Sequence, residues 1–180
     1  PLMKNTFFDE IESKKKLSNF ILTSPKLSMG EQCRKFEIEF SKYQGRKDAI
    51  LFNSGGSANL ALIQSLSNLG LLKEKAKIGF SSLTWSTNVM PIIQLGFSPV
   101  AVDCNPNTLN IMSQDLKDVI KKTSLDALFI TNALGFAGDL KEIKEICDDN
   151  KIILIEDSCE ALGTIVSGKK TGNYGLGASF

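Results

Sequence analysis

Short apolar runs alternate with amphipathic stretches along most of the chain. The runs have the length of buried strands, and apolar residues recur at three- and four-residue steps in the stretches between them, as in helices. We expect strands at 77–80, 99–102, 127–130 and in the run that ends at Asp157, and helices at 58–69, 86–95, 113–122 and 139–150. This alternation predicts an α/β three-layer sandwich with a mainly parallel sheet.

The first fifty residues follow a different pattern. Residues 28–31, Ser-Met-Gly-Glu, form a capping-box pattern and predict a helix that starts there. Its apolar stripe is Cys33, Phe36, Phe40 and Tyr43. A short strand is expected next, at 49–52. Within the later helix 86–95, Pro91 should introduce a kink or mark the first turn.

Composition narrows the function classes. The 180 residues carry 21 basic and 20 acidic side chains, so the net charge of +1 predicts no nucleic-acid partner. The densest basic run, 14–16, is interpreted as a solvated helix face. No window approaches the ~18 consecutive apolar residues of a membrane helix, and residues 1–5 are not followed by the apolar part of a signal peptide. We therefore expect a cytoplasmic protein without a membrane partner.

Cysteine and histidine usage limits the chemistry further. The four cysteines lack CxxC spacing and are interpreted as reduced, mostly buried thiols, so no metal site is expected. The chain has no histidine, which excludes a histidine-based triad or metal site within these residues. The cysteines are Cys33, Cys104, Cys147 and Cys159.

A small-residue segment, Asn53-Ser54-Gly55-Gly56-Ser57-Ala58, separates an apolar run from an apolar helix. Glycines let the backbone approach a ligand closely, and the free N–H groups of a helix start favour an anion. The segment is either a phosphate cradle, in which Ser57 supplies a hydroxyl, or a plain strand-to-helix turn. It matches neither the dinucleotide nor the Walker fingerprint.

Two further features follow strand ends. Trp85, the single tryptophan, either stacks on a planar ring or packs a loop onto the core. Asp157 ends an apolar run at the sheet edge where ligands bind, and it could hold a protonated ring nitrogen, a ribose hydroxyl or a metal, or simply cap a turn. The lack of clustered metal ligands and of a GxGxxG motif favours the ring nitrogen. Glu160 is a second partner or a surface charge.

In this order and spacing, Gly55-Gly56-Ser57-Ala58, Thr84-Trp85, Ile155-Glu156-Asp157 and the later glycines Gly168, Gly172 and Gly175 resemble the sugar aminotransferases of the DegT/DnrJ/EryC1/StrS group. These are pyridoxal-phosphate enzymes of fold type I. The resemblance implies that residues 1–180 are the N-terminal part of the cofactor-binding large domain, that 1–45 form its N-terminal helical segment, and that the C-terminal half of the enzyme is absent.

The resemblance also implies a cofactor, partners and residue roles. The cofactor is pyridoxal 5'-phosphate or pyridoxamine 5'-phosphate, the substrates are a nucleotide-linked keto sugar and an amino-acid donor, and the enzyme is a homodimer active in polysaccharide or deoxyamino-sugar biosynthesis. Asp157 is the catalytic partner of the ring nitrogen, and Trp85 stacks on the ring. Glu160 stands where the family often has His or Gln near the ring hydroxyl. The phosphate ligands are Gly55, Gly56 and Ser57.

Four points remain open from the sequence. The family's cofactor-linking Lys falls beyond Phe180, and a branch of nucleotide-sugar 3-dehydrases has His there and removes a hydroxyl; residues 53–60 and Glu160 look somewhat more like that branch. Ser179 or the residue after Phe180 matches the phosphate-binding Ser. The chain is otherwise a non-catalytic fragment or interaction domain, and a Rossmann-type nucleotide domain is weakened by the missing glycine fingerprint.

Overall fold

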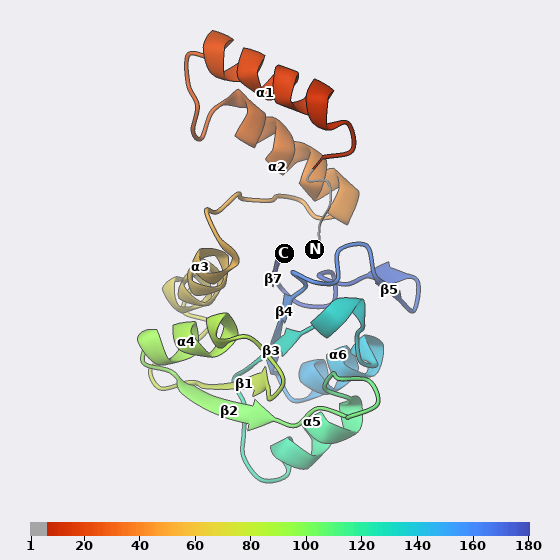
Figure 1. The fold of residues 1–180 in the computed structure, drawn as a ribbon. Helices are drawn as coiled ribbons and strands as arrows, with labels where there is room; N and C mark the ends of the chain where they lie inside the picture. The colour runs from red at the N-terminus through yellow and green to blue at the C-terminus, as the bar shows by residue number, and fades with distance from the viewer. Residues whose placement is uncertain (1–6) are drawn as a thin grey trace.

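The computed structural model describes residues 7–180, and its centre is a sheet of five parallel strands (Figure 1). Residues 1–6, including the start of the expected helical segment 1–45, lie outside the described residues. The strand order is β2-β1-β3-β4-β7. The strands are β1 (Lys77–Ser81), β2 (Ser98–Val102), β3 (Ala127–Thr131), β4 (Ile153–Asp157) and β7 (Ala178–Ser179). The predicted α/β class and the four predicted strands at the centre of the fold are confirmed.

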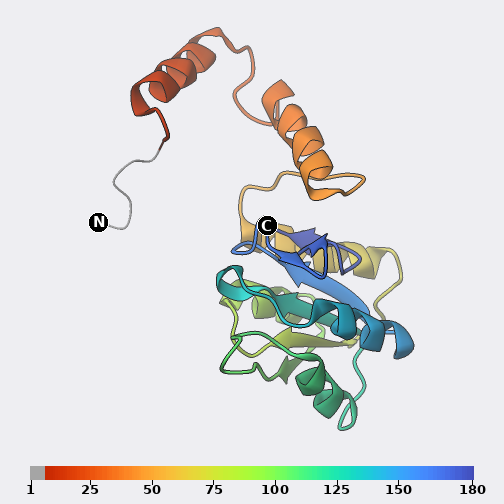
Figure 2. The same ribbon diagram turned by 90° about the vertical axis from the view of Figure 1, so that its right-hand side faces the viewer.

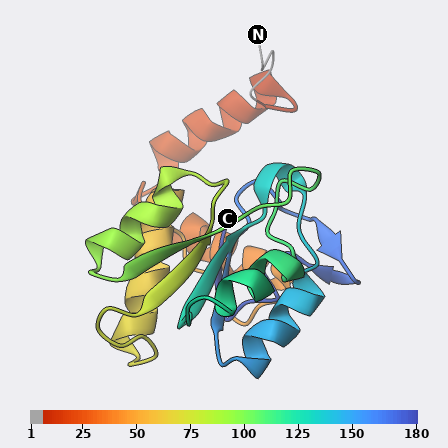
Figure 3. The same ribbon diagram turned by 90° about the horizontal axis from the view of Figure 1, so that it is seen from below.

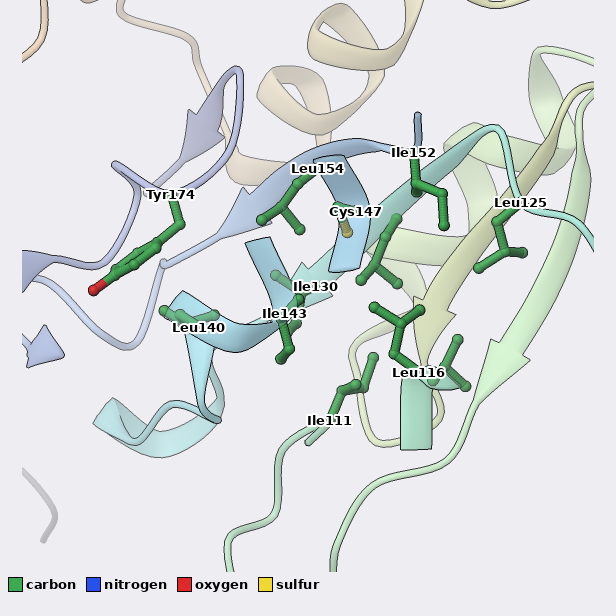
Figure 4. Close-up of a cluster of buried hydrophobic side chains, with 12 residues drawn as sticks. Ile111, Leu116, Leu125, Ile130, Leu140, Ile143, Cys147, Ile152, Leu154 and Tyr174 are labelled. Atoms are coloured by element: carbon green, nitrogen blue, oxygen red, sulfur yellow. The ribbon is translucent and has the colours of Figure 1, made fainter. Parts of the chain in front are cut away.

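Helices cover both faces of the sheet (Figure 3). Helices α3 (Gly55–Asn68) and α4 (Ser86–Gln94) lie on one face, and α5 (Ser113–Ile120) and α6 (Leu140–Asp149) lie on the other. Successive strand residues point to opposite faces, so the fully buried strand β3 supplies both layers. Phe129 packs with Ile63 of α3, while Ile130 packs with Ile143 of α6. The α5/α6 core is shown in Figure 4.

The N-terminal helices α1 (Glu10–Thr23) and α2 (Glu31–Gln44) stand apart from the layered body (Figures 1 and 2). No residue of α1 is buried. The C-terminal part of α2 is fastened to the body: the ring of Phe40 packs edge-on against Phe180, and the Gln44 amide donates to the carbonyl of Thr171. Arg46, which follows the helix, adds bonds to the same loop. Within the described residues, every helix is too short or too polar to cross a lipid bilayer.

Several sequence predictions are wrong near the ends of the chain. The capping box at Ser28 does not form: α2 begins at Glu31 after Gly30, because Met29 takes a left-handed backbone conformation with φ 47°. Residues 49–52 form an extended connection and pair with no strand, and the N–H of Leu51 donates to the Glu37 carboxylate instead. The hairpin β5 (Ile165–Val166) and β6 (Lys169–Lys170), the 3₁₀ turn η1 (Ala133–Gly135) and β7 were not predicted.

Helices α3 and α4 also differ from expectation in ways that affect the site. Helix α3 begins at Gly55 rather than Ala58, so the two glycines belong to its first turn. Pro91 lies inside α4, past its first turn. Because proline has no backbone N–H, the carbonyl four residues earlier, that of Thr87, loses its helical partner. That carbonyl accepts a bond from the Asn59 side chain of α3 at 3.3 Å, which joins the two helices.

Gly175 gives a test of the close approach between the 172–177 segment and β4. A Cβ atom at Gly175 would lie 2.7 Å from the Leu154 carbonyl oxygen and 3.0 Å from the Ile155 Cα, both backbone atoms. We expect Gly175→Ala to lower the free energy of unfolding by about 2 kcal/mol or more, the range of overpacked cores. Gly55→Ala is the matched control, since its Cβ meets nothing within 4 Å. Urea unfolding measures both, and equal effects would contradict this packing.

Candidate functional site

The candidate site lies where the strand order reverses, at the carboxyl ends of β1 and β3. The connection after β1 leads to α4 on one face, and the connection after β3 leads to α6 on the other. Such a divergence opens a crevice for ligands in parallel α/β sheets. Thr84, after β1, and Thr131, at the end of β3, join hydroxyls across it at 2.6 Å. Asp157 and Trp85, two of the predicted site residues, follow the strands β4 and β1 at this same edge of the sheet.

Asp157 is the last residue of β4 and is only 4% exposed. It lies on the same face of the strand as Ile155 and points toward α3 and α4. Its Oδ2 atom accepts bonds from the side-chain amides of Asn59 in α3, at 3.1 Å, and Asn88 in α4, at 2.8 Å. Its Oδ1 atom accepts from the Cys159 backbone N–H at 3.1 Å. The carboxylate is thus held by N–H donors.

The predicted phosphate segment forms the start of α3. Ser54 is the N-cap, and its hydroxyl oxygen accepts from the Ser57 N–H at 3.2 Å. The N–H groups of a helix's first turn have no acceptor within the helix, and together with the helix dipole they favour an anion. A Cβ at Gly56 would lie 3.4 Å from the Thr87 side chain, so this turn lies against the first turn of α4.

Trp85 is the N-cap residue of α4, and its carbonyl accepts the Asn88 N–H at 3.1 Å. Its side chain is 78% exposed, so the tryptophan does not pack a loop onto the core. Through Asn59 and Asn88, the structure brings Asp157 together with the first turns of α3 and α4. Trp85 and the segment Gly55–Ser57 therefore lie around one carboxylate.

Glu160 is exposed, and its carboxylate is committed to a turn. Its Oε2 atom accepts the Leu134 N–H at 2.7 Å. Leu134 and Gly135 have left-handed backbones, with φ 56° and 81°, so this bond stabilises an unusual turn after β3. Glu160 therefore lies on the β3 side of the crevice, and the structure joins it to the turn after β3 and not to Asp157.

Ser179 adds a hydroxyl that the sequence could only suggest. In the pairing of β4 with β7, Ser179 lies opposite Asp157, so both side chains point to the same face. Ser179 is buried, and its Oγ atom has no hydrogen-bond partner among the described residues. It shares an open pocket of about 690 Å³ with Ser54 and Gly55 at the start of α3. A buried hydroxyl without a partner beside a helix start is an available phosphate donor.

The neighbouring acid, Glu156, points to the opposite face and is fully buried. Its carboxylate accepts three backbone N–H groups, from Gly172 at 2.8 Å, Tyr174 at 2.7 Å and Gly175 at 2.8 Å. The Asn132 side chain donates a fourth bond at 3.2 Å. Glu156 thus organises the loop that leads into β7 and Ser179.

Arg46 binds the same loop from its carbonyl side. Its guanidinium donates to the carbonyl of Gly172 at 2.7 Å and to that of Gly175 at 2.6 Å. The peptides of the 172–175 loop are therefore held between a carboxylate on their N–H side and a guanidinium on their carbonyl side. Charge-assisted bonds of this kind are the strong ones.

Cys159 lies close to the site, but its thiol is unreactive. Contrary to the expectation of mostly buried thiols, its residue is exposed, while Cys147 alone is fully buried and Cys33 and Cys104 are partly buried. Desolvation and then the negative charge of Asp157 raise the pKa of the Cys159 thiol to about 12. The thiol stays protonated at neutral pH and is a poor nucleophile.

The sequence interpretation missed Asn59, Asn88 and the supporting role of Glu156. Asn59 comes four residues before Ile63 and seven before Leu66, on the buried stripe of α3, and Asn88 lies in the mainly apolar helix α4. Buried amides of this kind need partners, so their positions were a usable signal. Their common partner became visible only when the fold brought α3, α4 and β4 together.

Comparison with known proteins agrees with this geometry. The family model described as the DegT/DnrJ/EryC1/StrS aminotransferase family matches residues 9–180. The chain is 35% identical, over its whole length, to GDP-4-keto-6-deoxy-D-mannose 3-dehydratase of Escherichia coli O55:H7, covering 46% of that protein. It is 31% identical to GDP-perosamine synthase of Vibrio cholerae, with 85% of this chain and 40% of that protein aligned.

A solved structure is similar over almost the whole chain. The E. coli GDP-4-keto-6-deoxy-D-mannose-3-dehydratase with bound hydrated PLP superposes with a TM-score of 0.87 at 35% identity, covering 98% of this chain and 45% of that one. This match confirms the predicted fold. The chain spans about half the length of the curated relatives it matches.

Glu156→Gln tests the buried carboxylate. A glutamine turns one acceptor oxygen into an N–H donor that faces backbone N–H groups, so we expect the free energy of unfolding to fall by about 2–4 kcal/mol. Glu160→Gln is the control, because that exposed carboxylate accepts a single backbone bond and should lose less than about 1 kcal/mol. Denaturant unfolding of both variants gives the comparison, and a stable Glu156→Gln protein would refute this role.

Proposed function

Because the chain belongs to the DegT/DnrJ/EryC1/StrS aminotransferase family, we propose that it is the cofactor-binding portion of a pyridoxal-phosphate-dependent enzyme acting on a nucleotide-linked keto sugar. The observation that carries the proposal is Asp157, a buried carboxylate at the carboxyl end of a parallel strand, held by amide donors beside two helix starts. A carboxylate in this setting suits a protonated ring nitrogen whose phosphate lies a few ångströms away.

The residues present fit such a cofactor. The first turn of α3, at Gly55, Gly56 and Ser57, offers N–H groups and a hydroxyl to the phosphate, and the unpartnered Ser179 hydroxyl offers another donor. Trp85 offers an exposed aromatic face to the ring. When bound, the cofactor supplies an electron sink next to the reacting carbon.

The chain's own residues then have separable tasks. Asp157 would accept a hydrogen bond from the ring N–H and so keep the ring nitrogen protonated, and Trp85 would orient the ring and exclude water from one face. Glu160 would bind the ring hydroxyl through Oε1, since Oε2 already accepts the Leu134 N–H. The remaining half of the full-length enzyme would supply the residue that links to the cofactor or acts as the base.

Of two reactions, removal of the C3 hydroxyl is favoured over amino transfer. Two 3-dehydratases are 35% and 33% identical to the chain, compared with 31% for GDP-perosamine synthase. Residues 53–60 and the acid at Glu160 also favour the dehydratase branch. Amino transfer from an amino acid such as glutamate stays the second candidate because the family model and the synthase match both support it.

The full-length protein allows a direct test of the reaction. Incubated with the cofactor, glutamate and GDP-4-keto-6-deoxy-D-mannose, it should release a sugar nucleotide that has lost the oxygen at C3, identified by mass spectrometry. A product in which an amino group replaces the carbonyl oxygen supports the second candidate. If neither product forms and the cofactor does not bind, the chain is a non-catalytic interaction domain.

The Asp157→Asn variant ties that activity to the site. We expect turnover to fall by about a hundredfold or more, because an amide cannot balance the charge of a protonated ring nitrogen. Asp103→Asn is the matched control, since Asp103 follows β2 at the same sheet edge and contacts none of the residues around Asp157. Equal losses in the two variants would refute the assignment.

We further propose a cytoplasmic homodimer. Helix α1 has no buried residue, and its apolar side chains are exposed on more than one side, which indicates that the helix is covered in the assembly. The exposed residues are Ile11, Leu17, Ile21 and Leu22. Light scattering of the full-length protein should give twice the monomer mass, and Leu22→Glu should reduce it. Lys16→Glu, about a third of a turn around the helix from Leu22, should not. A monodisperse monomer would contradict the proposal.

A further inference from the structure

Two amides converge on one oxygen of Asp157. Asn59 and Asn88, each 1% exposed, place Nδ2 at 3.1 and 2.8 Å from Oδ2. We call this pair the amide clamp. The clamp joins α3 and α4 to the end of β4, so the position of the carboxylate depends on both helices (Figure 1).

The orientation of both amides follows from their partners. An ionised carboxylate only accepts hydrogen bonds, so each Asn must present its NH₂ group to it. For Asn59 a second acceptor fixes the same choice, because the other hydrogen goes to the Thr87 carbonyl at 3.3 Å. That carbonyl is free because Pro91 has no N–H. The proline in α4 therefore contributes to holding Asn59 against Asp157.

The two oxygens of Asp157 are consequently not equivalent. A carboxylate oxygen has two lone-pair sites. On Oδ2 both are occupied by the clamp, and a proton there would face two N–H donors. On Oδ1 one is occupied by the Cys159 N–H at 3.1 Å, and no second N–H donor reaches this oxygen among the described residues. The single vacancy of the carboxylate lies on Oδ1.

We propose that Asn59 and Asn88 are positioning residues that direct the ring N–H of the bound cofactor to Oδ1 of Asp157 and keep the shared proton off Oδ2. The proposal rests on the proposed function, because it needs a cofactor with a ring nitrogen. It goes beyond that function by assigning the carboxylate oxygen that accepts the hydrogen bond from the ring N–H and the side chains that select it.

A pair of ligands isolates this contact in full-length protein. One is pyridoxal 5'-phosphate, and the other is its analogue with the ring nitrogen replaced by C–H. Wild-type protein should bind the first more tightly, and the ratio of the two Kd values reports only the ring-nitrogen interaction. In Asn59→Leu and Asn88→Leu we expect this ratio to fall by about tenfold, the size of one charge-assisted bond.

Asn132→Leu is the control. Asn132 is equally buried, at 1%, and also donates to a carboxylate, but to Glu156 on the opposite face. The Asn132→Leu variant should have a lower free energy of unfolding and an unchanged ratio of the two Kd values. An unchanged ratio in both clamp variants, or an equal fall in Asn132→Leu, would overturn the positioning role while leaving the proposed function intact. Failure of wild-type protein to bind pyridoxal 5'-phosphate would overturn the proposed function itself.

A second measurement needs no variant. In a crystal structure of the wild-type protein with bound pyridoxal 5'-phosphate, the ring nitrogen should lie within hydrogen-bond distance of the Asp157 oxygen that faces away from both asparagines. A ring nitrogen bonded to the oxygen held by Asn59 and Asn88 would overturn the inference whatever the variants show.

Discussion

The fold around the site depends on the burial of one carboxylate, that of Glu156. A charge removed from water is costly unless hydrogen bonds compensate for it. Here four N–H groups do so, three of them from the 172–175 loop, and the loop's carbonyls bind Arg46 in turn. The opposite charges never touch. Instead they hold the peptide groups of one loop between them, and this loop sets the position of β7 and the docking of α2.

Strand geometry gives the two adjacent acids at the end of β4, Glu156 and Asp157, different roles. Side chains alternate across a sheet, so Glu156 enters the α5/α6 layer and Asp157 enters the α3/α4 layer. The carboxylate of Glu156 is fully engaged in hydrogen bonds that hold the fold, whereas the carboxylate of Asp157 can accept a further hydrogen bond from a ligand. The same strand thus builds the support of the site and the site itself, and a shift of register by one residue would exchange the two.

Much of the fold and the location of the candidate site could be predicted from the sequence. Periodicity predicted the central strands, the parallel sheet and its two helical layers, because apolar runs of this length have few other uses in a soluble domain. Strand ends located Asp157 and Trp85, and the glycine turn located the start of α3. The wrong predictions concern local structure. The backbone conformation of Met29 moved the start of α2, and residues 49–52 had no neighbouring strand to pair with.

The clamp and the Glu156 loop could not be predicted, because their partners lie far apart in sequence. Asn59 and Asp157 are separated by 98 residues and Arg46 and Gly172 by 126, and no periodic pattern encodes such pairs. The two-residue strand β7 is likewise too short to leave a signal of its own. These contacts are set by tertiary packing, and their only trace in the sequence is a polar residue in an apolar element.

Arg46, which attaches α2 to the body, can bind its partners only after the 172–175 loop has been synthesised. Its carbonyl partners, Gly172 and Gly175, are made 126 and 129 residues later. Until they leave the ribosome, helix α2 has no body to dock on, and Phe40 and Gln44 lack their partners Phe180 and Thr171. The layered domain must therefore assemble first, and the N-terminal helices join a surface that is completed by the last residues described.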